Sequence, residues 1–312
     1  MEIRLLNRDE IETPKWNGCV HYASNSKIYG YSWYLDNVCN GNWVGLVEGD
    51  YQSVMPLVWN DKLLKTKQLY SPYLCQQLGV FSVNMLSKER IKQFLEAIPK
   101  EYKYWDINLN DGSQQVLGLR DNPAYDITEK DNYHLYLNKP YEELQAKYSK
   151  NTKRNLKKAD QAGIYLTAGL KPEKFVTLVQ EAQEKKGVKH PDALYHTAHR
   201  VIYNCLHRGQ GTILGAFDDD KNILAGAFLM FNGAAIINLL NFSNEAGKEV
   251  GAMHYLIDSL VQREANKHKY IDFEGSSVEG IARFYKSFGA ERMPYYQLKN
   301  NQLPWLLKLV KK

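Results

Sequence analysis

Residues 235–290 constrain the fold more than any other part of the sequence. An apolar run over 235–242 gives way to a polar stretch with two glycines, after which apolar residues recur at helical spacing. A second apolar run covers 270–275, and 280–289 again has helical character. The segment therefore predicts, in order, a strand, a glycine-bearing loop, a helix, a second strand and a second helix. That order can build an anion site beside two strands that part.

The predicted loop, 247–252, is the first candidate binding site. The first turn of a helix leaves backbone N–H groups unpaired and carries a partial positive charge, and glycines let a pyrophosphate approach it. A strand-to-helix turn that binds nothing is the structural alternative. Backbone N–H groups near the end of the preceding strand could polarise a thioester carbonyl. The candidate cofactor-binding residues are Phe242, Gly247, Lys248, Gly251 and Ala252.

Three side chains near the end of the segment are candidates for catalysis. Tyr285 projects from the second helix, where its phenol could protonate a leaving thiolate. Lys286 could hold a phosphate or a developing oxyanion. Glu274 shares one face with Asp272 by strand alternation and could take the proton of an amine. A buried tyrosine, an exposed lysine and a helix-capping carboxylate are the structural alternatives.

A basic helix predicted over 149–162, with Gly163 as its C-cap, is the fourth candidate. Six of the twelve residues in 147–158 are basic and none is acidic. Because no acid in this run can pair with them, we expect a phosphate-rich partner rather than a self-paired surface. CoA, a nucleotide-linked acceptor and tRNA all fit that description. The candidate substrate-binding residues are Lys150, Lys153 and Arg154.

The composition is that of an ordinary globular protein. The chain has 312 residues, enough for two domains, with 44% hydrophobic and 24% charged residues. A formal charge of +5 is too small for a dedicated nucleic-acid binder. No apolar run reaches about 18 residues, so we expect no membrane span. The N-terminus lacks the apolar core of a secretory signal, which favours the cytoplasm.

Cysteines and histidines give no metal-binding pattern. The four cysteines lack paired spacing, as expected of buried free thiols in a reducing compartment. His196 and His199 lie three apart on a predicted helix, without a carboxylate–histidine motif. We therefore expect no metal site and no tightly bound cofactor.

The order of predicted elements divides the chain into two similar halves, 1–132 and 133–312. In the first half, the sequence predicts strands over 3–7, 43–48, 52–59 and 103–109, with helices over 31–38 and 87–98. Residues 110–131 are rich in Asp, Asn and Gly and are interpreted as a loop or domain joint. The second half predicts helices over 172–186 and 191–206, then strands over 211–217, 223–231 and 235–242. No residue-level repeat links the halves, and 304–312 is predicted as a short amphipathic helix.

Three motifs together carry a resemblance to a known superfamily. They are the basic run 148–159, Asp-Phe-Glu-Gly-Ser at 272–276, and Ile-Ala-Arg-Phe-Tyr-Lys-Ser-Phe-Gly-Ala at 281–290. The chain resembles the FemAB-like acyltransferase branch of the GNAT superfamily. Its N-terminal half, with Tyr34-Leu35-Asp36 and Gln76-Gln77-Leu78-Gly79-Val80-Phe81, looks like the first half of an uncharacterised group of this branch, of the kind found in Bacteroidetes. The resemblance covers most of the chain and is strongest from Tyr133 to Leu298.

The resemblance implies an α/β fold of two tandem GNAT-like domains, each a mixed, largely antiparallel sheet flanked by helices. In GNAT enzymes a tyrosine matching Tyr285 often protonates the CoA thiolate, and the loop matching 247–252 holds the pyrophosphate. In Fem-type enzymes the donor is aminoacyl-tRNA, and a lysine of the last helix, near Lys286, positions the reacting carbonyl.

Two departures from these patterns keep the donor open. The loop lacks the Gln/Arg-x-x-Gly-x-Gly/Ala form of typical CoA binders, and the chain has no room for the helical hairpin that many Fem enzymes insert. The leading hypothesis is an acyltransferase that moves an acyl group from a carrier thioester, most simply acyl-CoA as co-substrate, to an amine. The alternatives are a Fem-like aminoacyl-tRNA-dependent transferase acting on a cell-wall precursor, and a degenerate protein that only binds an anionic ligand.

Overall fold

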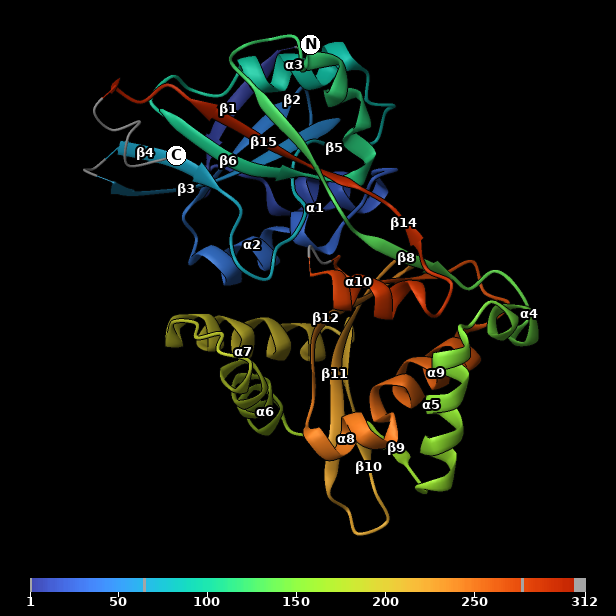
Figure 1. Ribbon diagram of the computed structural model, residues 1–312. Coiled ribbons are helices and arrows are strands. Elements are labelled where there is room, and N and C mark those ends of the chain that lie inside the picture. Colours follow the sequence, from blue (N-terminus) through green and yellow to red (C-terminus); the bar gives the residue numbers. More distant parts are fainter. Residues whose placement is uncertain (1, 64–65, 276–277, 306–312) are drawn as a thin grey trace. The chain divides into compact units, whose positions relative to one another are not determined.

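The computed structural model describes residues 2–63, 66–275 and 278–305, which form two compact units (Figure 1). Unit 1 comprises the chain up to Lys130 together with the segment that begins at Pro294, and unit 2 is Asp131–Met293. The predicted second domain, 133–312, therefore differs from unit 2 at its C-terminal end. The reason is that the last strand pairs within the sheet of unit 1.

In the described part of the chain, unit 1 holds an eight-stranded sheet in the order β1-β2-β3-β4-β6-β15-β7, with β5 paired to β3. Its one parallel pair is β4 with β6, and the other described pairs are antiparallel. The strands are β1 (Ile3–Asn7), β2 (Trp43–Glu48), β3 (Ser53–Leu63), β4 (Thr66–Tyr70), β5 (Phe81–Ser82), β6 (Tyr104–Leu109), β7 (Asp126–Lys130) and β15 (Tyr295–Asn301).

Short helices complete unit 1: α1 (Thr13–Tyr22), the 3-10 helix η1 (Ile28–Gly30), α2 (Ser32–Cys39), α3 (Lys88–Glu96) and the 3-10 helix η2 (Asp111–Leu119). Ser87 caps α3 as predicted, because its hydroxyl accepts the N–H of Arg90. Phe94 of α3 and Val116 of η2 are fully buried against the sheet. Residues 110–131 were predicted as a loop or a domain joint: the loop is wrong, since η2 and β7 lie there, whereas the boundary between the units does fall within this range, after Lys130. Asp, Asn and Gly favour turns locally, but burial of Val116 and Ile127 in the core outweighs that preference.

Unit 2 holds a seven-stranded sheet in its described residues, in the order β14-β8-β13-β12-β11-β10-β9. Only β12 and β13 pair in parallel there. The strands are β8 (Tyr133–Tyr136), β9 (Tyr165–Thr167), β10 (Gly211–Phe217), β11 (Ile223–Asn232), β12 (Ala235–Ser243), β13 (Tyr270–Asp272) and β14 (Glu291–Arg292). The prediction of three consecutive strands between 211 and 242 is confirmed.

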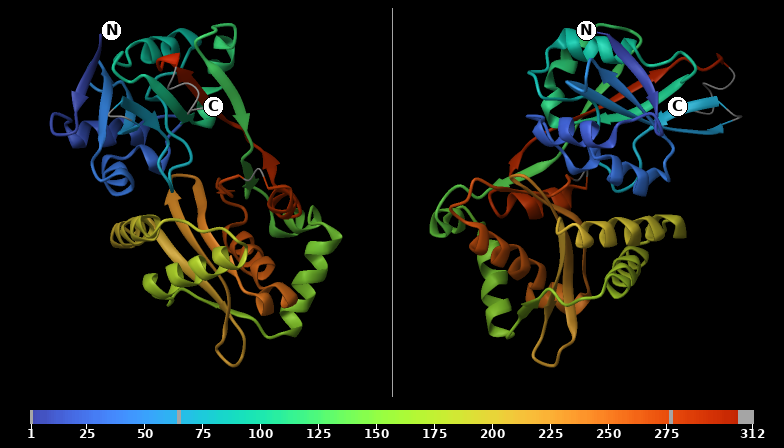
Figure 2. Two further views of the ribbon diagram at one scale, coloured as in Figure 1. Left: turned by 60° about the vertical axis from the view of Figure 1, so that its left-hand side comes forward. Right: turned by 180° about the vertical axis from the view of Figure 1, so that it is seen from behind.

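Helices cover both faces of this sheet: α6 and α7 on one, α5 and α9 on the other (Figures 1 and 2). They are α4 (Tyr141–Ala146), α5 (Lys150–Gln161), α6 (Pro172–Lys185), α7 (Asp192–His207), α8 (Glu245–Val250), α9 (Ala252–Glu264) and α10 (Glu279–Lys286). Leu256, Ile257 and Leu260 of α9 pack into the main core. The helix predicted at 304–312 lies mostly outside the described residues.

In the described residues, no helix is both long and apolar enough to cross a membrane. All four cysteines are buried free thiols, as the sequence predicted.

Candidate active site

The two parallel strands of unit 2 stay together for only three residues. Ala235 pairs with Tyr270, Ile236 with Ile271, and Ile237 with Asp272. Beyond that point β12 continues to Ser243 with β11 as its partner, while β13 ends at Asp272. The strands therefore part, as the order strand, glycine segment, helix and strand predicted. The parting leaves one edge of β12 without a described strand partner.

The glycine segment after β12 is helical rather than the predicted loop. Asn244 caps α8, and its Oδ1 accepts the N–H of Gly247 at 2.7 Å, so this amide is already bonded. A Cβ on residue 247 would lie 2.1 Å from the carbonyl oxygen of Leu224. Gly247 is thus required by packing. The loop prediction is wrong because Asn and Gly indicate a change of chain direction but do not show whether the residues between them form a turn of helix.

Gly251 separates α8 from α9 and approaches the basic helix closely. Its φ of +75° ends α8, and a Cβ there would meet the backbone oxygen of Asn155 at 2.7 Å. The next residue, Ala252, begins α9, whose N-terminus has no side-chain cap. Gly251 supplies no side-chain cap to the first turn of α9, and Ala252 in that turn is fully buried.

Phe242 and Lys248 line a pocket between the end of β12 and the end of α6. Phe242 is buried, and its ring centroid lies 5.8 Å from that of Phe175. Three exposed lysines and two exposed glutamates line the pocket, so its lining carries a small excess of positive charge. The pocket is lined by Leu178, Glu181, Ala182, Lys185, Lys186, Phe242, Ser243, Asn244, Glu245 and Lys248.

The three predicted catalytic residues lie together around the start of β8. Tyr285 of α10 is 7% exposed and stacks on Phe273, with ring centroids 4.4 Å apart. The ammonium of exposed Lys286 lies 5.3 Å from the ring centre of Tyr133. Burial, and then the nearby charges of Glu274 and Asp272, raise the pKa of Tyr285. A tyrosine in this environment stays protonated and can act as a proton donor.

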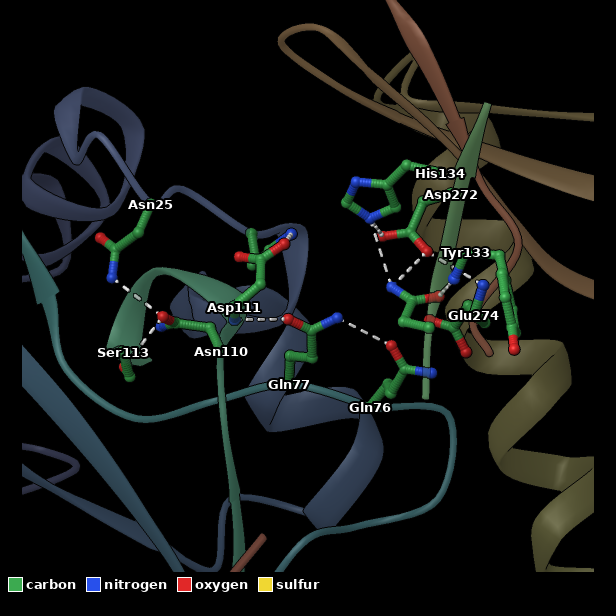
Figure 3. A network of polar contacts seen from close by, with 12 residues as sticks. Asn25, Gln76, Gln77, Asn110, Asp111, Ser113, Tyr133, His134, Asp272 and Glu274 are labelled. Atoms are coloured by element: carbon green, nitrogen blue, oxygen red, sulfur yellow. Dashed lines mark hydrogen bonds and ion pairs between the residues drawn. The ribbon is translucent and has the colours of Figure 1, made fainter. Parts of the chain in front are cut away.

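A buried polar network adjoins these residues, and sequence reasoning missed it (Figure 3). The carboxylate of Asp272 lies 3.2 Å from Nε2 of His134 and accepts a hydrogen bond from Asn132 at 2.9 Å. Asp272, His134 and Asn132 are all at most 3% exposed. Asp272 and His134 are direct cross-strand neighbours, so only the register of β13 on β8 brings them together. No local sequence signal marks that pairing.

Glu274 does not share the strand face of Asp272, contrary to the sequence prediction. β13 ends at Asp272, and Glu274 has a φ of +57°, which is left-handed and breaks the alternation of side chains. Its N–H donates to Oδ1 of Asp272 at 2.9 Å. The turn therefore directs Glu274 independently of the sheet.

The basic helix is attached to α10 beside Tyr285. The N–H of Ser149 and the hydroxyl of Thr152 both donate to the carbonyl oxygen of Ser287, at 2.9 and 3.0 Å. The predicted α5 is confirmed, with Ser149 as its N-cap and Thr152 on its buried face. Lys150, Lys153 and Arg154 are all exposed, and none forms an ion pair with another described residue.

Three solved structures share this architecture. FemX aligns over 100% of both chains with a TM-score of 0.73 and 13% sequence identity. The chain therefore has the same fold as FemX. A conserved protein of unknown function from Bacteroides thetaiotaomicron aligns over 96% of this chain and 100% of its own, with a TM-score of 0.60 and 12% identity. The C-terminal domain of a protein named as a putative lysylphosphatidylglycerol synthetase, from Agrobacterium fabrum, aligns over 96% of this chain and 94% of its own. Its TM-score is 0.56 and its sequence identity is 12%.

In sequence, no protein-family model matches the chain, and no match was found among the curated proteins. At 12–13% identity, the structural likeness establishes the fold and leaves the reaction to be argued from the site. Among the described residues, no group of His, Cys, Asp and Glu is arranged to hold a metal ion.

Proposed function

We propose that this protein transfers an acyl group from an activated carrier, most simply acyl-CoA, to an amine. The observation that carries the proposal is the parting of β12 and β13, with Glu274 and Tyr285 both at the end of β13. A strand edge left open beside a proton acceptor and a proton donor suits acyl transfer between two bound substrates. The fold shared with FemX agrees with the resemblance to Fem-type transferases that the sequence motifs carry.

The proposed chemistry assigns one proton to each residue. The amine nitrogen attacks the thioester carbonyl while the Glu274 carboxylate takes the amine proton. Backbone N–H groups of β12 near Phe242 stabilise the oxyanion that forms, and Lys286 adds positive charge. The carbon–sulfur bond then breaks, and Tyr285 gives its proton to the departing thiolate. The products are an amide and a free thiol.

The phosphates of the donor are proposed to lie against the first turn of α9, beginning at Gly251 and Ala252. This turn lacks a side-chain cap, and exposed Lys248 precedes it in α8. Gly247 is left out of direct contact because its N–H already bonds Asn244. The proposed anion site therefore keeps Lys248, Gly251 and Ala252 of the predicted segment. It lies at the start of α9 rather than at Gly247 in α8.

The proposed function is tested by titrating the protein with acetyl-CoA and assaying thiol release with a panel of primary amines. We expect saturable binding and amine-dependent release. In Tyr285→Phe, kcat falls by about 10²-fold or more while donor binding and folding persist. An unchanged rate in Tyr285→Phe removes this residue from the mechanism. Binding without turnover on any amine favours the degenerate anion-binding protein instead.

A second donor, aminoacyl-tRNA, is favoured by the exposed basic face of α5 beside α10, whose Lys153 and Arg154 form no ion pair with another described residue. Such a donor neutralises several cations at once, so its affinity falls steeply with salt. We expect Lys153→Ala combined with Arg154→Ala to reduce the slope of log affinity against log salt by about two. A flat salt profile with the intact protein, together with thiol release from acetyl-CoA, argues against a tRNA donor.

A further inference from the structure

The Asp272 carboxylate is held from three directions (Figure 3). Its Oδ1 accepts from Nδ2 of Asn132 and from the N–H of Glu274, both at 2.9 Å, and its Oδ2 lies 3.2 Å from His134 Nε2. Asn132 is fully buried, and its own Oδ1 accepts the N–H of Tyr133 at 2.7 Å. The side-chain contacts therefore tie the end of β13 to the start of β8.

The bond between Asp272 and Glu274 closes a turn of defined shape. A side-chain oxygen that accepts the N–H two residues later forms an Asx turn, which competes with strand continuation. Glu274 then takes a left-handed conformation, with φ of +57°, which a residue with a Cβ rarely adopts unless its surroundings impose it. The following Gly275 passes so close to Asp131 that a Cβ would lie 1.9 Å from its carbonyl oxygen.

The turn matters because it decides where the Glu274 carboxylate goes. An extended backbone would keep Glu274 on the strand face of buried Asp272. With the left-handed turn, the Glu274 carboxylate lies close enough to Tyr285 for its negative charge to raise the pKa of the phenol. Burial of Tyr285 raises that pKa more. A base must lie within hydrogen-bond reach of the proton that it removes, so the shape of this turn controls proton transfer.

We infer that Asp272 is a positioning residue. Braced by Asn132 and His134, it fixes the backbone of Glu274 and thereby places the Glu274 carboxylate for proton transfer from the amine. The inference rests on the proposed function for its kinetic consequence, whereas its backbone consequence stands independently of any activity. Asp272 itself touches no substrate in this account.

The kinetic test is a double-mutant cycle between positions 272 and 274. Glu274→Gln removes the base, and we expect kcat to fall about 10²–10⁴-fold. Asp272→Ala removes the acceptor of the Glu274 N–H, and we expect a fall of about 10-fold or more with the donor KM unchanged. If Asp272 acts through Glu274, the double variant is no slower than Glu274→Gln alone. Losses that multiply in the double variant overturn the inference.

Asp272→Asn is the conservative variant that separates geometry from charge. Asparagine keeps an oxygen that can accept the N–H of Glu274, so we expect at least about half of the wild-type kcat. A loss as large as that of Asp272→Ala would show that the charge matters rather than the turn, and would overturn the inference. Asp258→Ala is the matched control, because this carboxylate also belongs to unit 2 and is partly buried, but it bonds Tyr141 instead. Its kcat should stay within about twofold of wild type.

Amide hydrogen exchange tests the backbone claim without an activity assay. We expect the Glu274 amide to exchange about 10-fold faster or more in Asp272→Ala and at the wild-type rate in Asp272→Asn. Unchanged exchange in Asp272→Ala overturns the inference even if the enzyme is active. If no donor and amine give turnover, the proposed function fails while exchange still decides the turn. Should Asp272→Ala not fold, Asn132→Ala takes its place in both tests, with the same non-additivity expected and the same multiplicative loss overturning it.

Discussion

Units 1 and 2 share one strand order but differ where their parallel strands meet. In each, three antiparallel pairings link four strands, a parallel pair follows, and two further antiparallel pairings complete the sheet. In each, two α-helices separate the first two strands. The strand β15 enters unit 1 after the chain has left unit 2, and β8 enters unit 2 after the chain has left unit 1. The duplication suggested by the sequence pattern is therefore a duplication of topology.

In unit 1, the segment that follows β4 pairs with β6 beyond the point where the parallel pairing of β4 and β6 ends. After β4, Ser71 donates its N–H to Asp106 of β6 at 3.2 Å, and Leu78 returns to donate to Asn108 at 3.0 Å. Leu78 and Leu109 form a parallel bridge, so β6 stays paired to its end. The parallel pairs of the two units both span three residues, but in unit 2 the chain leaves β12 directly into α8.

The difference teaches that the fold alone does not create a site. Both units have the topology for parting strands, but unit 1 fills the position with its own backbone, whereas in unit 2 no described strand pairs with that edge of β12. Glu274 follows the last parallel pair of unit 2 by two residues, and Asn108 follows that of unit 1 by the same number. The charge of Glu274 raises the pKa of buried Tyr285, whereas the N–H of Asn108 donates to the hydroxyl of Ser71.

The largest expected effect separates these matched positions by activity. Glu274→Gln should lower kcat about 10²–10⁴-fold, because the glutamine cannot accept the amine proton. Asn108→Ala, at the matched place in unit 1, should leave kcat within about twofold. Steady-state assays with one donor and one amine make the measurement. Equal losses in both variants would break the comparison.

The second prediction concerns Gly247, in the short helix α8 that follows β12. Gly247→Ala places a Cβ 2.1 Å from the Leu224 carbonyl, and we expect a loss of about 2–3 kcal/mol from overpacking. Chemical denaturation measures the change in the free energy of unfolding. Gly280→Ala is the control, since a Cβ added at that glycine would have nothing within 4 Å. An unchanged stability in Gly247→Ala would contradict the conclusion that packing requires this glycine.

The third prediction sets the acid stability of unit 2 against that of unit 1. Burial lowers the pKa of the His254 imidazole from 6.5 to about 4, where it packs 4.9 Å from the Phe284 ring. Between these values the unfolded chain binds a proton that the folded state does not, so stability falls as pH drops from about 6.5 to 4. Allowing for partial exposure of the ring, we expect a loss of about 1–2 kcal/mol.

His254→Phe tests this assignment by removing the titrating group and keeping a ring. The difference in unfolding free energy between pH 6.5 and 4 should shrink by about the same 1–2 kcal/mol. Urea denaturation at several pH values supplies the measurement. An identical pH dependence in the variant would show that His254 has no part in acid sensitivity. His21, the histidine of unit 1, is exposed and serves as the matched control through His21→Phe.

The smallest expected effect is a gain in unit 1. Gly18 lies inside α1, and nothing is within 4 Å of a Cβ added there. Gly18→Ala should raise the unfolding free energy of unit 1 by about 0.5–1 kcal/mol, because alanine loses less backbone entropy in a helix. Thermal denaturation detects the shift. A loss of stability would show that the helix depends on a close contact at this glycine.

Much of the secondary structure of unit 2 could be predicted from local pattern. Alternation and turn residues located β10, β11 and β12, and Pro172 with helical spacing located α6. Tyr285, Lys286 and Glu274 were predicted as catalytic because their residue types suit proton transfer and anion binding, and that role stays a prediction. The short helix α8 and the turn at Glu274 were missed, since each depends on a hydrogen bond from one particular side chain.

The sequence by itself determined the order of the elements and the kinds of chemistry that their ends can offer, because capping, periodicity and charge are properties of neighbours along the chain. The tertiary structure alone decided that His134 meets Asp272, that β15 joins the sheet of unit 1, and that the chain after β4 returns to pair with the end of β6. Those outcomes depend on strand register and on pairing between residues far apart in sequence. Their free energy comes from burial shared by the whole sheet, so no short stretch of sequence encodes them.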